Sequence, residues 1–593
     1  MEQLWSMSTT LREAERIIGF AKTAYELDGA IWNKENQIKY QVLLIQNRIY
    51  LSPDNTQSLN GLSQHQISIL SNLDHNLTYD EAQSIFVAKN YEDPPMRGRQ
   101  SMSPLKKLGL VYIKEKKIYC TDLCKKLIKS EISIEDFMFD SLIKYQYPNP
   151  IERGYLNWDT KPFINTLRLI KTVNNLVDVS GGSPKGISKT EFGIFALSLK
   201  NYRDINFVAS KIINFRMQYN KIPVDERNSF VLKYIDDYLK DFNNPRKNCF
   251  EYTDNIIRYL RLTKYVYLRG KYANTYIDLE PRRMIEIDSL LDFDDGSAKE
   301  FTNEEWYDFI GSYGSYILPF ETLEALTSIA ISIIDENNRI KAELDIEPDY
   351  VNLYSDTSQL KTQIFELREE RTYLQNLEIK HDYHSNSNKI DEAINALNDI
   401  LNRKKVNLAK RYSIELEKWA NIALNIINDS IKIKPNTKVG DDNEPIFTAP
   451  AGAPDIECYY ETFNGICEVT MLVGRDQWYN EGQPVMRHLR DFEDKNTSKD
   501  CYCIFVAPRM HNDTLNTFLM ANKYGYNGQK QKIVPISIRQ LTIILSKVKD
   551  FIQRGDTFTH KNLKNLLDKC SDISTINTTS DWMSHVEQQI NSI

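Results

Sequence analysis

Apolar and polar residues alternate in several short runs within the last third of the 593-residue chain. A period of two is typical of β-strands whose two faces meet different surroundings. The turn-forming pair Asn464-Gly465 is expected to join the first two runs in a hairpin, with Asp455 opening the first strand. The predicted strands are residues 455–460, 463–473, 500–506 and 532–538.

A helical pattern lies between the second and third runs. Val485, Leu489 and Phe492 recur at i, i+4 and i+7, and Pro484 is expected to start this helix because proline is common in the first helical turn. A hairpin, a crossover helix and further strands predict an α/β domain over residues 405–593.

Leucine and isoleucine at helical spacing dominate residues 321–408. This pattern predicts long amphipathic helices, an antiparallel pair broken at residues 381–388. His381 and His384 lie on the break without further ligand partners, so we interpret them as exposed loop histidines. We expect residues 291–404 to form a helical linker.

Residues 1–290 show short helices followed by small hairpins. The first unit has a capping-box pattern at Thr78 and Glu81 and a hairpin over 110–120, and a second unit covers 252–283. Such units, with basic residues on the last helix and the turn, have a winged-helix outline. The basic residues are Arg97, Arg99, Lys106, Lys107, Arg258, Arg261 and Lys271.

One such unit alone is more often a structural helix and hairpin with solvated charges. Two or three in series, upstream of a possible metal site, favour a DNA-reading module instead. Phosphate contacts then hold the register, and one helix per unit reads base edges.

Composition and charge narrow the classes of protein. The net charge of −7 does not itself favour nucleic-acid binding, so a basic face must be offset by acidic residues elsewhere. The eight cysteines contain no C-x-x-C pair, which indicates neither a zinc site nor a disulfide framework. Without a signal-peptide pattern or a run of about 20 apolar residues, we expect a soluble cytoplasmic protein.

The candidate chemistry centres on two carboxylates. Glu468 lies 13 positions after Asp455, and paired antiparallel strands bring such residues side by side. Like charges this close repel unless a cation lies between them, and Mg²⁺ prefers oxygen ligands. By spacing alone, the two could also be solvated strand carboxylates. Glu481 follows 13 residues after Glu468, and His488 lies one turn into the predicted helix.

The pattern Pro-Asp, a dozen residues, then Glu-x-Lys resembles the PD-(D/E)xK nuclease core, with Thr470 at the usual lysine position. Longer segments, in order, extend the resemblance to the AlwI family of type IIS restriction endonucleases, which includes the BstNBI-type strand-nicking enzymes. It runs from about Met96 to about Leu545. The segments are FMFDSLIKYQYPNP, RYLRLTKYVYLRGKY, APAGAPDIECYY, GICEVTMLVG, EGQPVMRH and CYCIFVAP.

This resemblance implies a multidomain, mainly α protein. Its N-terminal winged-helix subdomains would recognise duplex DNA, and a helical linker would lead to a C-terminal α/β nuclease core that cuts a few bases outside an asymmetric site. The resemblance assigns catalytic roles to Asp455, Glu468, Glu481, His488 and, in the preceding helix, Glu417 rather than Glu415. Glu-Val-Thr is what the family shows, so Thr470 is not a departure from it.

The resemblance also implies a cofactor and partners. Mg²⁺ would be held by Asp455, Glu468 and the Val469 carbonyl. A second copy or a small nuclease subunit would complete a double-strand break, and a cognate DNA methyltransferase would belong to the same prokaryotic system.

Two other classes of protein compete with the enzyme. A non-catalytic DNA-binding protein with a decayed nuclease-like fold is disfavoured by the three intact acids. A partner-binding protein built on the helices of residues 321–408 leaves the pattern at 454–488 unexplained.

Overall fold

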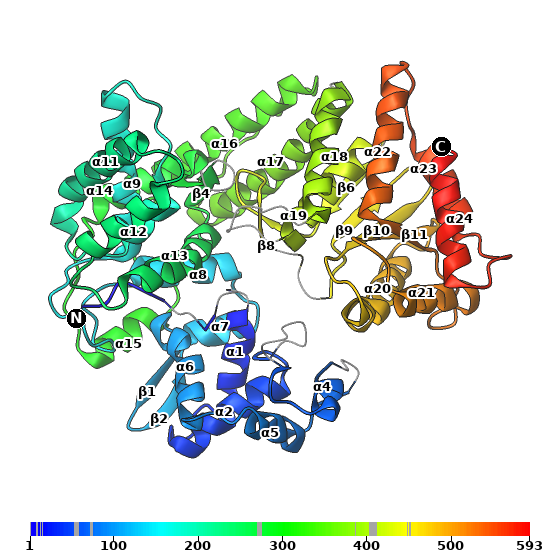
Figure 1. Ribbon diagram of the computed structural model, residues 1–593. Coiled ribbons are helices and arrows are strands. Elements are labelled where there is room, and N and C mark those ends of the chain that lie inside the picture. Colours follow the sequence, from blue (N-terminus) through cyan, green and yellow to red (C-terminus); the bar gives the residue numbers. More distant parts are fainter. Residues whose placement is uncertain are drawn as a thin grey trace. The chain divides into compact units, whose positions relative to one another are not determined.

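The computed structural model divides into two compact units and is mostly helical (Figure 1). It describes residues 2–7, 10–11, 14, 16–51, 59–71, 75–269, 275–385, 387–402, 412–427, 429–447, 449 and 452–593. Unit 1 comprises Met1–Leu70, Asp74–Ser332 and Leu353–Ile364, and unit 2 comprises Ser71–Leu73, Ile333–Asn352 and Phe365–Ile593. Among the described residues, no helix is long and apolar enough to cross a membrane.

The first part of unit 1 contains a short antiparallel hairpin, β1 with β2, whose turn residues Glu115 and Lys116 both have positive φ. A bridge between Ile31 and Lys117 adds a third extended segment beside β2. The elements are α1 (Arg16–Tyr25), α2 (Lys34–Gln46), α4 (Gln64–Ser71), α5 (Tyr79–Ala88), α6 (Pro94–Lys107), β1 (Val111–Lys114), β2 (Lys117–Cys120), α7 (Asp122–Ile128) and α8 (Ile134–Lys144).

Local signals decide where these helices begin. Thr78 and Glu81 form the predicted capping box at the start of α5, which confirms that prediction. Asp93 caps α6, and Pro94 occupies its first turn, where its missing N–H costs nothing.

The second part of unit 1 repeats this strand arrangement. β3, β4 and β5 form a sheet in the order β3-β5-β4, with both pairs antiparallel. Gly186 makes the pairing possible, because a Cβ there would lie 2.1 Å from the carbonyl oxygen of Ile277. The elements are α9 (Pro162–Val179), β3 (Ile187–Ser188), α10 (Lys189–Glu191), η1 (Phe192–Ala196), η2 (Tyr202–Asp204), α11 (Ile205–Lys221), α12 (Arg227–Tyr238), α13 (Pro245–Leu262), β4 (Val266–Arg269), β5 (Tyr276–Leu279), η4 (Pro281–Arg283), α14 (Met284–Phe293) and α15 (Asn303–Gly311).

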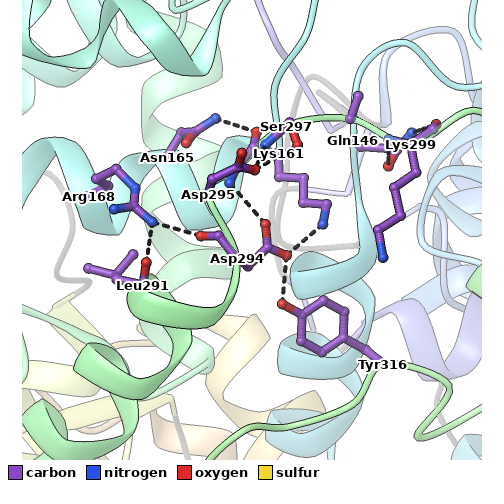
Figure 2. A network of polar contacts seen from close by, with 12 residues as sticks. Gln146, Lys161, Asn165, Arg168, Leu291, Asp294, Asp295, Ser297, Lys299 and Tyr316 are labelled. Atoms are coloured by element: carbon purple, nitrogen blue, oxygen red, sulfur yellow. Dashed lines mark hydrogen bonds and ion pairs between the residues drawn. The ribbon is translucent and has the colours of Figure 1, made fainter.

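A buried polar network holds the chain where it leaves α14 (Figure 2). The carboxylate of Asp294 forms an ion pair with Lys161 and accepts a 2.6 Å hydrogen bond from the Tyr316 hydroxyl. Arg168 donates to the carbonyl oxygen of Asp294 at 2.7 Å, and the carbonyl of Gly296 accepts from the Lys161 N–H at 2.8 Å. Figure 2 shows Lys161 and Arg168, at and on α9, meeting the 294–299 segment, and Tyr316 reaching Asp294 from a separate segment. These contacts fix the 294–299 segment to α9.

Unit 2 contains a five-stranded sheet in the order β12-β11-β10-β9-β6. β10, β11 and β12 are parallel to one another, and β9 is antiparallel to both of its neighbours, β10 and β6. α20 and α21 pack on one face of this sheet, and α19 and α22 on the other (Figure 1). The strands are β6 (Lys432–Pro435), β7 (Lys438–Val439), β8 (Pro445–Phe447), β9 (Ile456–Tyr459), β10 (Asn464–Val469), β11 (Cys501–Ala507) and β12 (Ile533–Ser537). β7 and β8 form a separate antiparallel hairpin.

Long helices precede the sheet, and shorter ones connect and follow its strands. α17 continues to Ser385 and α18 begins at Ser387, so most of the break predicted at residues 381–388 is helical, and His381 lies on α17 instead of in a loop. The helices are α16 (Leu323–Glu343), α17 (Thr357–Ser385), α18 (Ser387–Leu401), α19 (Tyr412–Ile426), α20 (Arg475–Lys495), α21 (Asn512–Tyr524), α22 (Ile538–Gln553), α23 (His560–Ser571) and α24 (Thr579–Asn591).

Two local predictions are wrong. Asn464 and Gly465 lie inside β10, paired with Tyr459 and Cys458, so they do not form the turn. Pro484 does not start the crossover helix, because α20 begins nine residues earlier at Arg475. The first turns of α20 are held by tertiary hydrogen bonds from Gln477, which override the local proline signal.

Candidate active site

Strand register brings the two predicted carboxylates together. Cys467 of β10 pairs with Ile456 of β9, so one residue further along the register Glu468 lies opposite Asp455. The Oδ2 atom of Asp455 accepts a 2.8 Å hydrogen bond from the backbone N–H of Val469. This contact fixes Asp455 just before β9 begins, with its carboxylate beside that of Glu468.

The two carboxylates change each other's ionisation. Burial, followed by the charge of Asp455, raises the pKa of Glu468 well above its usual range. Burial also raises the pKa of Asp455 to about 6, although the Val469 N–H and the nearby His488 oppose this shift. Without a cation between them the pair therefore retains a proton close to neutral pH.

A third carboxylate, Glu417 of α19, lies in the same acidic cluster. Its Oε2 atom accepts hydrogen bonds from the Thr437 hydroxyl at 2.8 Å and from the Ala449 N–H at 3.2 Å. Burial and the charge of Asp455 raise the pKa of Glu417 to about 8, although both hydrogen bonds lower it. Glu417 is only 4% exposed, so solvent does little to stabilise its charge.

His488 of α20 completes the cluster. Its Nδ1 atom lies 2.8 Å from Oε1 of Glu468, within hydrogen-bond distance. Burial lowers the pKa of His488, which favours a neutral ring. Its Nε2 atom is buried and has no hydrogen-bond partner among the described residues. The ring thus has one nitrogen fixed by Glu468 and a second that remains able to exchange a proton.

The remaining candidate residues lie on α20 and at the end of β10. Glu481 is half-buried on α20, on the same face as His488 and two turns before it, about 10 Å away along the axis. Val469 is half-buried at the end of β10. The Thr470 hydroxyl accepts a 3.1 Å hydrogen bond from the Leu472 N–H. Thr470, at the position where PD-(D/E)xK cores usually carry lysine, therefore stabilises the loop after β10 through this hydrogen bond.

Comparison with protein families matches residues 106–544, well over half of the chain, to the AlwI restriction endonuclease. The protein belongs to the AlwI restriction endonuclease family. It is accordingly a DNA-hydrolysing enzyme. The matched residues contain all five predicted catalytic positions, and the family predicted from sequence is confirmed.

Curated proteins yield no match to this AlwI-family chain. Among solved structures, the small subunit of the heterodimeric restriction endonuclease BspD6I is 19% identical, with 34% of this chain and 99% of that chain covered and a TM-score of 0.28. The binding domain of the BpuJ1 endonuclease, solved with modified DNA, is 14% identical over 50% of this chain and 89% of its own, with a TM-score of 0.29. Restriction endonuclease FokI is 10% identical over 91% and 99%, with a TM-score of 0.22.

The donor set of the AlwI-family cluster fits a hard divalent cation. Within the part of the chain that the structure describes, no three or more His, Cys, Asp or Glu side chains are already arranged as a metal site. The oxygens of Asp455, Glu468 and Glu417 instead accept hydrogen bonds from, or contact, neighbouring protein groups. Three carboxyl groups with raised pKa values, of which Glu417 and Glu468 are buried, nevertheless require a cation to be ionised together.

The predicted DNA-contacting residues of unit 1 fall into two groups. On α6, Arg97 is half-buried and stacks over Tyr91, and Arg99 is exposed and donates hydrogen bonds to Asp93 and Gln37. Burial lowers the pKa of the half-buried Lys106 on the same helix.

The second group lies further from solvent. Lys107 is 15% exposed and forms an ion pair with Glu152 at 2.6 Å, so its charge is already neutralised within the protein. On α13, Arg258 is half-buried and Arg261 is 7% exposed. Lys271 lies outside the described residues.

Sequence reasoning missed Gln477, which is fully buried on α20. Its amide nitrogen donates to the carbonyls of Leu472 at 3.0 Å and Arg509 at 2.9 Å, and its Oε1 accepts from the His511 N–H at 2.8 Å. One side chain thus joins the loops that follow β10 and β11. The missed signal is a polar residue at a core-facing helical position, which becomes meaningful only when both loops are in place.

Proposed function

We propose that this AlwI-family enzyme is a type IIS restriction endonuclease, which recognises a short asymmetric duplex sequence and hydrolyses a phosphodiester bond a few bases outside it. The observation that carries the proposal is the buried cluster of Glu417, Asp455, Glu468 and His488 at one edge of the unit 2 sheet. The same proposal includes an enzyme that nicks one specific strand and an enzyme that acts as the large subunit of a two-chain endonuclease.

The nuclease core we infer is of the PD-(D/E)xK type. The hairpin β9–β10, the crossover helix α20 and the parallel strands β11 and β12 follow in the order expected of that core. The paired carboxylates come from its central hairpin. Residues 405–593 would then form the cleavage domain and 291–404 the linker.

DNA recognition is assigned to two winged-helix subdomains within residues 1–290. In each, the helix before the hairpin, α6 or α13, would contact DNA. The proposal is supported by the repeated strand arrangement, because both hairpins pair their second strand with a short extended segment from earlier in the chain.

The residues of this site would act together in hydrolysis, and Glu417 would face the metal site from α19, beside Asp455. Asp455, Glu468 and the Val469 carbonyl would hold Mg²⁺ against the scissile phosphate. When bound, Mg²⁺ lowers the pKa of a coordinated water and neutralises charge that develops on the phosphate. The Nε2 atom of His488 would accept a proton or contact a phosphate oxygen, since Glu468 already fixes Nδ1. Glu481 would orient the attacking water.

One cleavage core hydrolyses one strand. A double-strand break therefore requires a second copy of the chain or a separate small nuclease subunit. A DNA methyltransferase of the same system would protect host DNA.

The proposal is tested by incubating purified protein with supercoiled plasmid DNA and Mg²⁺ beside an Asp455→Ala variant. Discrete linear fragments in the wild-type lane alone indicate double-strand cleavage, and open circles alone indicate a nicking enzyme or a large subunit. Site-specific binding by both proteins without any cleavage would reject the catalytic proposal in favour of a DNA-binding protein.

A further inference from the structure

The β7–β8 hairpin holds Glu417 from both of its ends. Thr437, directly before β7, donates its hydroxyl to Glu417, and Ala449, shortly after β8, donates its backbone N–H to the same oxygen. Thr437 is 8% exposed and Glu417 4% exposed, so water does not substitute for these donors. The position of the Glu417 carboxylate thus depends on where the hairpin lies.

The turn of this hairpin is held by the long helix α17. Arg371 is 1% exposed, and its guanidinium forms ion pairs with Asp441 in the turn at 2.7 Å and with Glu336 of α16 at 3.2 Å. Gln375, one helical turn further along α17, donates to the carbonyl oxygen of Asp441 at 3.1 Å. Two side chains of α17 therefore bind the same turn residue, Arg371 through the Asp441 carboxylate and Gln375 through its backbone carbonyl.

Further contacts hold the hairpin against both α17 and α19. Asn443 of the turn donates to the side chain of Asn376 on α17 at 3.3 Å. Glu444 forms an ion pair with Lys418, the residue after Glu417 on α19. The hairpin thus lies between α17 and α19, and Figure 1 shows β8 beside these two helices.

The buried ion pairs of Arg371 cost more desolvation free energy than a purely structural contact requires. Burying a guanidinium and its carboxylate partners loses their hydration, and well-packed apolar side chains often stabilise such positions as well or better. The planar guanidinium instead holds two carboxylates, one through each terminal nitrogen, in a defined geometry. The turn and both ends belong to one short antiparallel hairpin, in which Lys438 pairs with Phe447 and Val439 with Pro445, so a shift of the turn is passed on to the ends.

We propose that Arg371 is a positioning residue for cleavage, which places Glu417 by fixing the turn of the β7–β8 hairpin to α17. The inference rests on the proposed function of Glu417 in the cleavage site. Arg371 itself contacts neither DNA nor metal in this role. The linker helix α17 thereby becomes part of the cleavage machinery rather than a passive spacer.

The test compares plasmid cleavage rates of the full chain carrying Arg371→Met with those of Lys341→Met. Lys341 is a matched control, because it is 5% exposed and forms ion pairs with Asp349 and Glu370, away from the hairpin. Arg371→Met should lower the cleavage rate by up to about 10-fold, less than the roughly 10- to 100-fold loss typical of a direct partner of a metal ligand, because Arg371 acts on Glu417 through the hairpin. Lys341→Met should cleave at the wild-type rate. Arg371→Lys, which keeps the charge, should recover part of the lost rate.

Equal rates for Arg371→Met and Lys341→Met overturn the inference. If Arg371→Met does not fold, Gln375→Met takes its place. This substitution removes the hydrogen bond from Gln375 to the Asp441 carbonyl without leaving a charge unpaired. Adding Glu417→Gln gives an independent check: the double variant should cleave no more slowly than Glu417→Gln alone.

The proposed function can fail separately. Unchanged cleavage in both Asp455→Ala and Glu417→Gln rejects the acidic cluster as the cleavage site. Loss of cleavage in Asp455→Ala with full activity in Arg371→Met rejects only the positioning role.

Discussion

The carboxylate of Asp455 accepts a 2.8 Å hydrogen bond from the backbone N–H of Val469, the residue that follows Glu468. One short contact across the β9–β10 hairpin therefore sets the separation of two acids that lie 13 positions apart in the sequence. The proposed metal site depends on this relationship, because a cation must reach both carboxylates at once.

Glu468→Gln should abolish cleavage and leave site-specific DNA binding intact. The amide keeps the shape of the side chain and a hydrogen-bonding group for His488 but removes the charge that a cation requires. We expect cleavage to fall by more than about 100-fold, since loss of a group that only orients a ligand already costs 10- to 100-fold. Plasmid cleavage and gel-shift binding measure the two effects. Glu461→Gln, at a side chain 77% exposed between the same strands, is the control and should cleave normally.

The stability of metal-free protein should decrease as the pH rises from about 4.5 to about 8. The pKa of Glu417 is raised from 4.5 to about 8 in the folded state, so the folded state binds more protons than the unfolded state across this range. Its contribution is fully present below pH 4.5 and is lost as pH approaches 8. The slope reaches at most about 1.4 kcal/mol per pH unit.

Thermal melting in a chelating buffer checks this sign. Glu417→Gln should flatten the pH profile, because the amide does not titrate. Mg²⁺ should raise the melting temperature more at pH 8 than at pH 5, where protons compete with it. A melting temperature that rises from pH 5 to pH 8 without metal would contradict the interpretation.

Gln477→Leu should destabilise unit 2 by about 1–3 kcal/mol, because buried backbone groups of the two loops lose their partner. Urea unfolding followed by circular dichroism measures the change. Gln588→Leu, at an exposed position of α24 in the same unit, should change the free energy of unfolding by less than about 0.5 kcal/mol. Equal effects would mean that the buried contacts of Gln477 contribute nothing specific.

Two ion pairs between the α9 and α14 regions should differ sharply in strength. Asp294→Asn leaves the buried ammonium of Lys161 without a counter-charge, which should cost unit 1 about 3–5 kcal/mol. Asp288→Asn breaks the more exposed pair with Lys171, which should cost about 0–1 kcal/mol. Urea titrations of both variants test the difference, and a larger loss for Asp288→Asn would refute it.

Arg97→Ala and Arg99→Ala should each weaken duplex binding and make it less salt-dependent. Loss of one phosphate contact lowers the slope of log affinity against log salt by about 0.9. Lys107→Ala should instead reduce stability, because Lys107 already neutralises Glu152. Fluorescence anisotropy at several salt concentrations separates these outcomes, and an unchanged slope for both arginine variants would remove α6 from the interface.

Local chemistry alone determined many elements of this protein. The capping box of Thr78 and Glu81 spans three residues, so its hydrogen bonds form wherever the rest of the chain lies. The hairpin that ends in β2 and the strands around Glu468 follow from alternation over a few positions. Short-range motifs also identified the family, which the match over residues 106–544 confirms.

Tertiary structure decided the rest. Asn464-Gly465 has the composition of a turn but forms a strand, and Pro484 lies within a helix, because packing against the sheet outweighs local preference. Only the fold shows that Glu417, far from Asp455 in sequence, shares its electrostatic environment.

The contacts of Gln477 and Arg371 were likewise beyond sequence reasoning. Each joins segments separated by many residues, and a polar side chain acquires such a role only when folding removes water from around it. The spacing of apolar residues predicts which face of a helix is buried. Which residue pairs with a buried polar or charged side chain depends on the tertiary fold, which brings distant segments together.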